Sequence, residues 1–176
     1  EFPDLLNDNG VFTGFDIVIA NPPYIDSETM ILNGDEILRM LLTKRFTHCK
    51  GNWDIYIAFF SLSFEVLNSN GNYVFITPDK WISRPFGFEL RKGLIRNISS
   101  IIETGRDIFK NAKVDSIITF IKMKETEYLS IQDFKVDDGL EIININKNSL
   151  TGNYSLDWLF SEHISLIKKI DNHPDK

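Results

Sequence analysis

Four consecutive residues, Asn21-Pro22-Pro23-Tyr24 (the tetrad), carry the strongest chemical signal in this sequence. The two prolines fix φ twice, restrict the residue before them and remove two backbone N–H donors. Backbone carbonyls therefore remain as acceptors. Asn21 adds a side-chain acceptor and donor, and Tyr24 adds a flat ring with a polar tip. A rigid, acceptor-rich corner beside an aromatic ring suits a planar ligand that bears an NH2 group.

The segment before the tetrad predicts where this chemistry lies in the fold. Phe15–Ala20 is nearly continuous in apolar character, which is typical of a strand buried on both faces in a parallel sheet. Ligands of open α/β sheets bind at the carboxyl ends of the strands. An Asn-Pro pair alone is usually a turn starter. Four specified residues directly after a hydrophobic strand favour a functional site.

Further strands and a hairpin predict an α/β fold. Three segments have the apolar and β-branched composition of strands: Tyr73–Thr77, Ser99–Glu103 and Val114–Lys122. The order β-α-β-α-β-β implies right-handed crossovers and a mostly parallel sheet, with an antiparallel last strand. Tyr128–Val136 and Leu140–Asn146 flank Asp137-Asp138-Gly139 and predict a β-hairpin extension.

Helices are predicted where apolar residues recur every three or four positions. One is expected around Gly34–Lys44. Another is expected over Asn52–Asn68, capped by its first residue and closed by Asn70-Gly71. Ser83 is the expected N-cap of a third helix, and Ser161–Ile170 has the pattern of an amphipathic helix near the C-terminus.

Composition and charge limit the classes to which this protein can belong. The 176 residues carry a net charge of −6, which argues mildly against a complete nucleic-acid-binding surface but does not exclude a catalytic module. The single cysteine excludes an intrachain disulfide framework and fits a reducing cytosol. No apolar run approaches the ~20 residues that a membrane span needs. His48 and Cys49 are adjacent, which is not a useful spacing for metal ligands, so no metal site is expected.

The tetrad and its flanks, Phe15–Ile25, resemble the catalytic motif of amino-methyltransferases that use S-adenosylmethionine. More closely, they resemble the N6-adenine DNA methyltransferases of bacterial type II and IIS restriction–modification systems. The resemblance continues through five further segments: Gly51–Phe60, Gly71–Pro78, Phe88–Lys92, Ile108–Val114 and Leu156–Trp158. It implies the C-terminal half of a Rossmann-like methyltransferase fold and a location in the bacterial cytoplasm.

The resemblance also implies roles for individual residues. The Asn21 side-chain oxygen and the Pro22 carbonyl would accept the two amino hydrogens of an adenine flipped out of the duplex. Tyr24 would stack on that base, and Pro23 and Phe109 would complete its pocket. Neither a general base nor a metal ion is required by this scheme.

Partners and boundaries follow from the same resemblance. Three cations are candidate DNA contacts: Arg84, Lys110 and Lys113. The cofactor would be S-adenosylmethionine, and most of its site would lie in an N-terminal half, because the family's Gly-rich loop is not found before the tetrad. Residues 1–125 would be the C-terminal half of the catalytic domain, 126–150 a β-hairpin extension, and 151–176 a linker and helix leading to a target-recognition domain. The chain alone is then expected to be an inactive fragment that binds double-stranded DNA only within the longer protein.

Two alternatives to a DNA methyltransferase stay open. The same tetrad serves methyltransferases of RNA bases and of protein glutamine side chains, and the chain could instead be a non-catalytic DNA-binding or assembly module. If the cofactor-binding strand is absent, Phe15–Ala20 has an unpaired edge, and such edges associate. We therefore expect either a homodimer through this edge or a cover formed by Glu1–Phe12.

Overall fold

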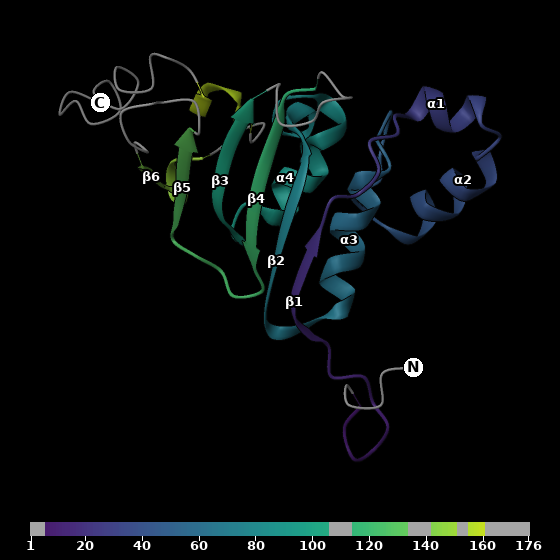
Figure 1. Cartoon of the computed structure of the whole chain (residues 1–176), viewed down its shortest axis with the longest axis horizontal. Helices are drawn as coiled ribbons and strands as arrows, with labels where there is room; N and C mark the ends of the chain where they lie inside the picture. The colour runs from purple at the N-terminus through teal and green to yellow at the C-terminus, as the bar shows by residue number, and fades with distance from the viewer. Residues whose placement is uncertain (1–5, 106–113, 134–141, 151–154, 161–176) are drawn as a thin grey trace.

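A six-stranded sheet forms the centre of the computed structural model, which describes residues 6–105, 114–133, 142–150 and 155–160 (Figure 1). The strand order is β1-β2-β4-β3-β5-β6. The bounds are β1 Phe15–Ala20, β2 Leu67–Pro78, β3 Ile98–Gly105, β4 Ser116–Lys122, β5 Tyr128–Asp133 and β6 Ile143–Asn146. The pairs β1–β2 and β3–β5 are parallel, whereas β4 is antiparallel to both β2 and β3, and β6 is antiparallel to β5. β1, β2, β3 and β5 thus run the same way, which confirms the mostly parallel α/β sheet with an antiparallel β4.

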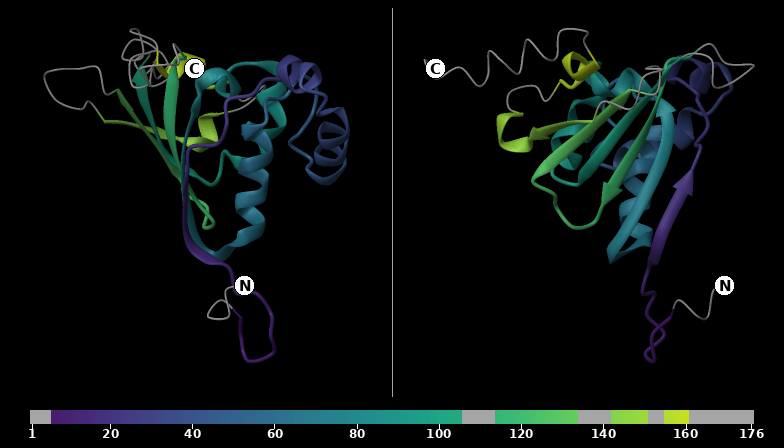
Figure 2. Two further views of the ribbon diagram at one scale, coloured as in Figure 1. Left: turned by 45° about the vertical axis from the view of Figure 1, so that its right-hand side comes forward. Right: turned by 60° about the vertical axis from the view of Figure 1, so that its left-hand side comes forward.

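The helices lie on one side of this sheet. Their bounds are α1 Ser27–Leu32, α2 Glu36–Arg45, α3 Tyr56–Val66 and α4 Phe88–Leu94, with 3-10 turns at Asp79–Ile82, Pro85–Gly87, Lys147–Ser149 and Asp157–Phe160. α3 and α4 cover one face of the sheet, and α1 and α2 project beside α3 (Figures 1 and 2). Within the described parts of the chain, no helix is long and apolar enough to span a membrane.

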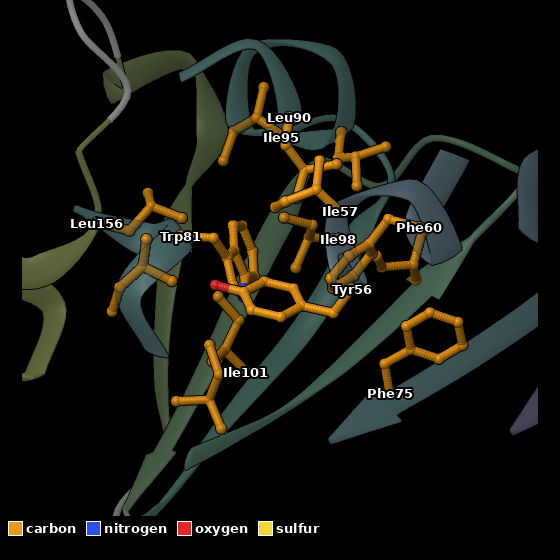
Figure 3. Packing of buried hydrophobic residues seen from close by; sticks show 14 of the residues in the cluster. Tyr56, Ile57, Phe60, Phe75, Trp81, Leu90, Ile95, Ile98, Ile101 and Leu156 are labelled. Carbon is orange, nitrogen blue, oxygen red and sulfur yellow. The ribbon is translucent and has the colours of Figure 1, made fainter. Parts of the chain in front are cut away.

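An aromatic cluster joins α3 to the sheet. Phe60 of α3 is fully buried, and its ring centroid lies 6.0 Å from that of Tyr73, 5.1 Å from Phe75 and 5.5 Å from Trp81 (Figure 3). Tilted and edge-on ring pairs at these separations are favourable beyond the area that they bury. This cluster fixes α3 against β2, and so fixes the loop that enters α3 near the tetrad.

The burial predicted for Phe15–Ala20 is wrong on one point. The strand forms as predicted, but Ile17 and Ile19 are 61% and 77% exposed. The reason is that Ile17 and Ile19 point to the face of the sheet opposite to Val18, which packs against the core beneath the helices, and that among the described residues β1 is an edge strand paired with β2 alone. The described part of the N-terminal segment forms a turn closed by a Leu6–Phe12 bridge, and it extends beyond the start of β1 rather than along its edge (Figure 1).

The predicted caps of α3 are also wrong. α3 begins at Tyr56, not near Asn52, and its N-cap position makes no side-chain cap bond. It ends at Val66, where β2 begins and runs through Asn70-Gly71. Gly71 does not end a helix. It lets β2 pass close to β1, since a Cβ at this position would lie 2.9 Å from the Phe15 carbonyl oxygen.

Two other local predictions need correction. Ser83 caps no helix, because a 3-10 turn at Pro85–Gly87 comes first and α4 begins at Phe88. The helix expected around Gly34–Lys44 forms as α2, but the short α1 before it was not predicted.

The predicted β-hairpin is confirmed as β5 and β6, with Leu129 opposite Ile145. It also continues the main sheet, since β5 pairs with β3. The predicted turn at Asp137-Asp138-Gly139 and the predicted helix Ser161–Ile170 lie outside the described residues.

Candidate functional site

The tetrad leaves the carboxyl end of β1, where the sequence predicted a ligand site. Ala20, the last residue of β1, lies opposite Phe75 of β2. Asn21 and Pro23 are exposed, Pro22 is buried and Tyr24 is half-buried. The tetrad therefore presents an exposed amide and a partly exposed ring at one corner of the sheet.

The chain after the tetrad is fixed by two local bonds. The Asp26 carboxylate accepts a 2.8 Å hydrogen bond from the Thr29 backbone N–H and so caps α1. The Ile25 carbonyl accepts a 2.9 Å bond from the Ile55 N–H, in the loop that enters α3. The chain directly after Tyr24 is thus tied to α1 and to the loop that enters α3.

The Tyr24 hydroxyl oxygen is buried. Burial raises the pKa of this hydroxyl, and the neighbouring Ser116 side chain, on the first residue of β4, acts in the opposite direction. Ser116 is fully buried and lies opposite Pro78, the last residue of β2. The Tyr24 hydroxyl, which follows β1, therefore lies near the start of β4.

A layer of acidic and phenolic side chains lies beneath the tetrad. Burial raises the pKa of the Asp54 carboxyl, against the opposing charge of Lys80. Burial and then the Asp54 charge raise the pKa of the Tyr56 hydroxyl, which also feels Asp79 and Tyr24. Burial and the neighbouring carboxylates of Asp115 and Glu103 raise the pKa of Asp79. These groups couple the tetrad electrostatically to the ends of β2 and β4.

Asp54 was not among the residues predicted for the site from the sequence. Tyr56 was not singled out. No local pattern marks them, since Asp54 lies in the turn that enters α3 and Tyr56 is the first residue of that helix.

A cleft of about 470 Å³ adjoins the loop after the tetrad. Its lining includes Asp26, Asp54 and Lys80, together with Arg84 and Phe86. The structure thus brings Arg84, one of the predicted DNA contacts, to the neighbourhood of the tetrad. The other predicted contacts, Phe109, Lys110 and Lys113, lie outside the described residues.

Two arginines hold the loops that line this cleft. Arg39 of α2 donates to the carbonyls of Gly51 and Trp53, at 2.7 and 2.8 Å, and its guanidinium lies 4.4 Å from the Trp53 ring centroid. Arg91 of α4 is buried and donates to the carbonyls of Trp81 and Arg84. Both guanidinium groups therefore have structural roles.

The hydrogen-bond acceptors of the tetrad fit a ligand that donates amino N–H groups better than they fit a metal ion. In the described ranges, no three His, Cys, Asp or Glu side chains are grouped so as to hold a metal. The exposed Asn21 amide and the carbonyl groups beside the prolines supply acceptors for N–H groups. At this end of the sheet, the tetrad is therefore suited to hold a planar amine.

The chain is similar to proteins of restriction–modification systems. The family model described as Eco57I restriction-modification methylase matches residues 1–109. The type II restriction enzyme and methyltransferase RM.Eco57I of Escherichia coli is 27% identical over 161 residues, which are 90% of this chain and 16% of that protein. The type II methyltransferase M.BstVI of Geobacillus stearothermophilus is 34% identical over 83 residues, which are 47% of this chain and 14% of that protein. The chain thus spans about a sixth of the length of the curated relatives it matches.

Solved structures share the fold. The type IIG restriction endonuclease BpuSI has a TM-score of 0.63 at 14% identity, over 91% of this chain and 22% of that chain. The type IIL restriction-modification enzyme MmeI, solved in complex with DNA, has a TM-score of 0.57 at 15% identity, over 80% of this chain and 19% of that chain. At these identities the likeness shows the fold alone.

Proposed function

Because this chain belongs to the Eco57I restriction-modification methylase family, we propose that it is the catalytic region of a DNA methyltransferase acting on the N6 amino group of adenine. The observation that carries this proposal is the position of the tetrad at the carboxyl end of β1, with Asn21 exposed and Tyr24 half-buried. Relatives described as type II methyltransferases support the reaction class.

Asn21 and Pro22 hold the amino group in the proposed mechanism. The N6 lone pair of adenine is delocalised into the ring, so the free base is a poor nucleophile. When the Asn21 side-chain oxygen and the Pro22 carbonyl accept the two amino hydrogens, the nitrogen keeps more lone-pair character while the new bond forms. These fixed acceptors are preorganised toward the charge of the transition state. S-adenosylmethionine would supply the methyl group from its sulfonium: the carbon–sulfur bond would break as the nitrogen–carbon bond forms, a neutral thioether would leave, and N6 would then lose one proton to water.

Tyr24 and Pro23 hold the base itself. The target adenine must leave the duplex, because its N6 is otherwise paired and stacked. Tyr24 offers a ring face, and stacking on an aromatic side chain is worth about 1–3 kcal/mol per base. Phe109 is proposed to contact the base from another side. Alignment of the two reactants is then the main source of the rate.

The chain is proposed to work inside a longer protein. Residues 1–125 form the C-terminal half of the catalytic domain, 126–150 an extension and 151–176 a link to a target-recognition domain. Most of the S-adenosylmethionine site then lies in the N-terminal half of that domain, which precedes these residues in the longer protein. Double-stranded DNA is the proposed partner, with Arg84, Lys110 and Lys113 as backbone contacts, and the bacterial cytoplasm is the proposed location.

The open edge of β1 supports a proposal about the isolated chain. Ile17 and Ile19 are exposed on a strand that, within the part of the chain that the structure describes, pairs on one side only. Apolar edge strands associate with one another, so we propose that the 176-residue chain forms a homodimer through β1. Light scattering tests this, and a monodisperse monomer would contradict it.

The substrate class is tested with the full-length protein and a radiolabelled methyl donor. Duplex DNA, transfer RNA and a protein with an accessible glutamine are offered separately. We expect label in DNA only. Label in RNA or in protein would identify one of the two alternative methyltransferases, and no transfer to any of the three would favour the binding module.

A further inference from the structure

Helix α2 is attached to the rest of the protein largely through polar side chains. None of its ten residues is buried, although it stands beside α3 (Figure 1). Arg39 donates to the carbonyls of Gly51 and Trp53, and Thr43 accepts a 3.1 Å hydrogen bond from the Trp53 ring N–H. Leu42 is the half-buried apolar residue on this side. The inner side of α2 is therefore unusually polar for a helix that packs on a core.

The outer side of α2 carries an apolar stripe instead. Ile37, Met40 and Leu41 are 71%, 49% and 55% exposed, and Lys44 continues the same spacing. Intervals of three and four residues place these four side chains, the α2 stripe, on one face of the helix. Leu32, the last residue of α1, is 86% exposed and precedes α2 by one short turn. An amphipathic helix normally turns such a face toward other protein, and gathered apolar side chains on a surface mark an interaction site.

The charges at the two ends of the stripe favour a protein partner over nucleic acid. Asp35 and Glu36 lie at its start, where they would repel the phosphates of DNA. Lys44 lies at its end, and the next cation, Arg45, is already paired with Glu65. A surface with an apolar centre, an acidic end and a basic end matches a second amphipathic helix that carries the opposite charge at each end.

The size of the stripe favours a partner within the same polypeptide. A stable interface between separate proteins takes about 20–30 residues on each side, far more than the stripe offers. A segment of the same polypeptide meets the stripe at a high effective concentration, so fewer contacts are sufficient. The chain aligns with only 16% of the length of RM.Eco57I and 14% of that of M.BstVI, which leaves ample length for such a helix in proteins of that kind.

We propose that the α2 stripe is the docking site for an amphipathic helix from another part of the longer protein. Arg39 fastens α2 to the loop that enters α3, and Ile25, directly after the tetrad, is bonded to the same loop. Docking at α2 therefore holds the tetrad in a fixed position relative to that other part. The inference rests on the proposal that this chain works inside a longer protein. It rests on no step of the proposed reaction, so a protein that methylates nothing leaves it standing.

The first test compares the rate at which hydroxyl radicals oxidise Met40 in this chain and in the full-length protein. Radical oxidation of a methionine depends on its access to solvent, so burying a side chain that is 49% exposed should slow the reaction at least ~fivefold in the full-length protein. Met30, which is fully buried, should react slowly in both proteins and so reports any unfolded fraction. Equal rates for Met40 in the two proteins, or protection that fades on dilution as a second copy dissociates, would overturn the proposal.

The second test asks whether the stripe itself makes the contact. Ile37→Gln combined with Leu41→Gln keeps residues that favour a helix and removes the apolar face. In the full-length protein this double variant should restore the Met40 rate of the isolated chain, an increase of at least ~fivefold. In the isolated chain, where both side chains are exposed, it should leave the urea midpoint unchanged.

Leu38→Gln is the matched control for the double variant, since Leu38 is 42% exposed on α2 but lies outside the stripe. It should leave Met40 protected in the full-length protein. A Met40 that stays protected in the double variant, or that is released equally by Leu38→Gln, would contradict docking at the stripe.

Discussion

Arg39 and Arg45 lie six residues apart on α2, both beside an aromatic ring, yet they should differ sharply in their contribution to stability. Arg39 bridges α2 to the carbonyls of Gly51 and Trp53. Arg45 pairs with Glu65 on the surface, where the two side chains are 60% and 44% exposed. Replacing either with Met keeps the apolar stem and removes the guanidinium.

The magnitude follows from the contacts of Arg39. Hydrogen bonds with a charged donor contribute about 1.5–3 kcal/mol each, and a cation–π contact adds at least ~0.5 kcal/mol. Because Arg39 is only partly buried, the lower ends of these ranges apply. We therefore expect Arg39→Met to lower the free energy of unfolding by about 3 kcal/mol. Arg45→Met should lower it by less than about 1 kcal/mol, as exposed ion pairs do.

Urea unfolding followed by tryptophan fluorescence measures both variants, and Trp53 reports directly on the Arg39 contact. The midpoint should move to lower urea for Arg39→Met with an unchanged slope, since the surface exposed on unfolding stays the same. Equal losses in the two variants would refute the reasoning. The reasoning would also be refuted if Arg39→Met lowered the free energy of unfolding by less than ~1 kcal/mol, which is the range of an ordinary surface ion pair.

Three further outcomes are expected. In the full-length protein, Asn21→Ala should abolish most methyl transfer while duplex binding by gel shift stays unchanged, because affinity comes mainly from phosphate contacts; a parallel loss of binding would contradict this. Tyr24→Ala should weaken capture of a fluorescent base analogue more than Tyr24→Trp does, with Tyr24→Phe in between, whereas equal effects of Ala and Phe would exclude stacking. Burial lowers the pKa of Lys147 from 10.5 to about 8, so the unfolded chain binds more protons between these values. The free energy of unfolding of the wild type should therefore rise with pH across that window relative to Lys147→Met; the comparison with the variant is needed because the buried Cys49 and Tyr56, whose pKa values are raised, act in the opposite sense. Denaturant titrations of both proteins at both ends of the window measure this difference, and a difference that stays constant with pH would contradict the lowered pKa.

The sequence predicted the elements with a clear periodicity. Phe15–Ala20 and Ser99–Glu103 form strands because their apolar and β-branched residues favour a pleated, buried surface. The position of the tetrad was predictable because a sharp Asn-Pro corner ends a strand. The exposure of Ile19 was not predictable, since it depends on which face of the sheet the rest of the fold covers, and a hydrophobic run has the same composition whether one face or both faces are buried.

The helix ends and the deeper site needed tertiary information. Asn52 has the residue type of an N-cap, but Arg39 holds the neighbouring carbonyls and α3 begins only at Tyr56. The preference of Asn for an N-cap position stabilises a helix by about 1 kcal/mol, which is less than the stabilisation from the hydrogen bonds that Arg39 donates. Ser116 is ninety-two positions from Tyr24 in the sequence, and only the insertion of β4 beside β2 brings the two together. No local pattern encodes that proximity.

The most direct measurement is the identity of the nucleoside that the full-length protein modifies. Duplex DNA is incubated with the protein and S-adenosylmethionine, digested to nucleosides and separated by mass spectrometry. We predict N6-methyladenine from the wild type and none from the Asn21→Ala variant. A methylated cytosine, or N6-methyladenine formed equally well by the Asn21→Ala variant, would contradict the assignment of the tetrad as the site that holds the adenine amino group.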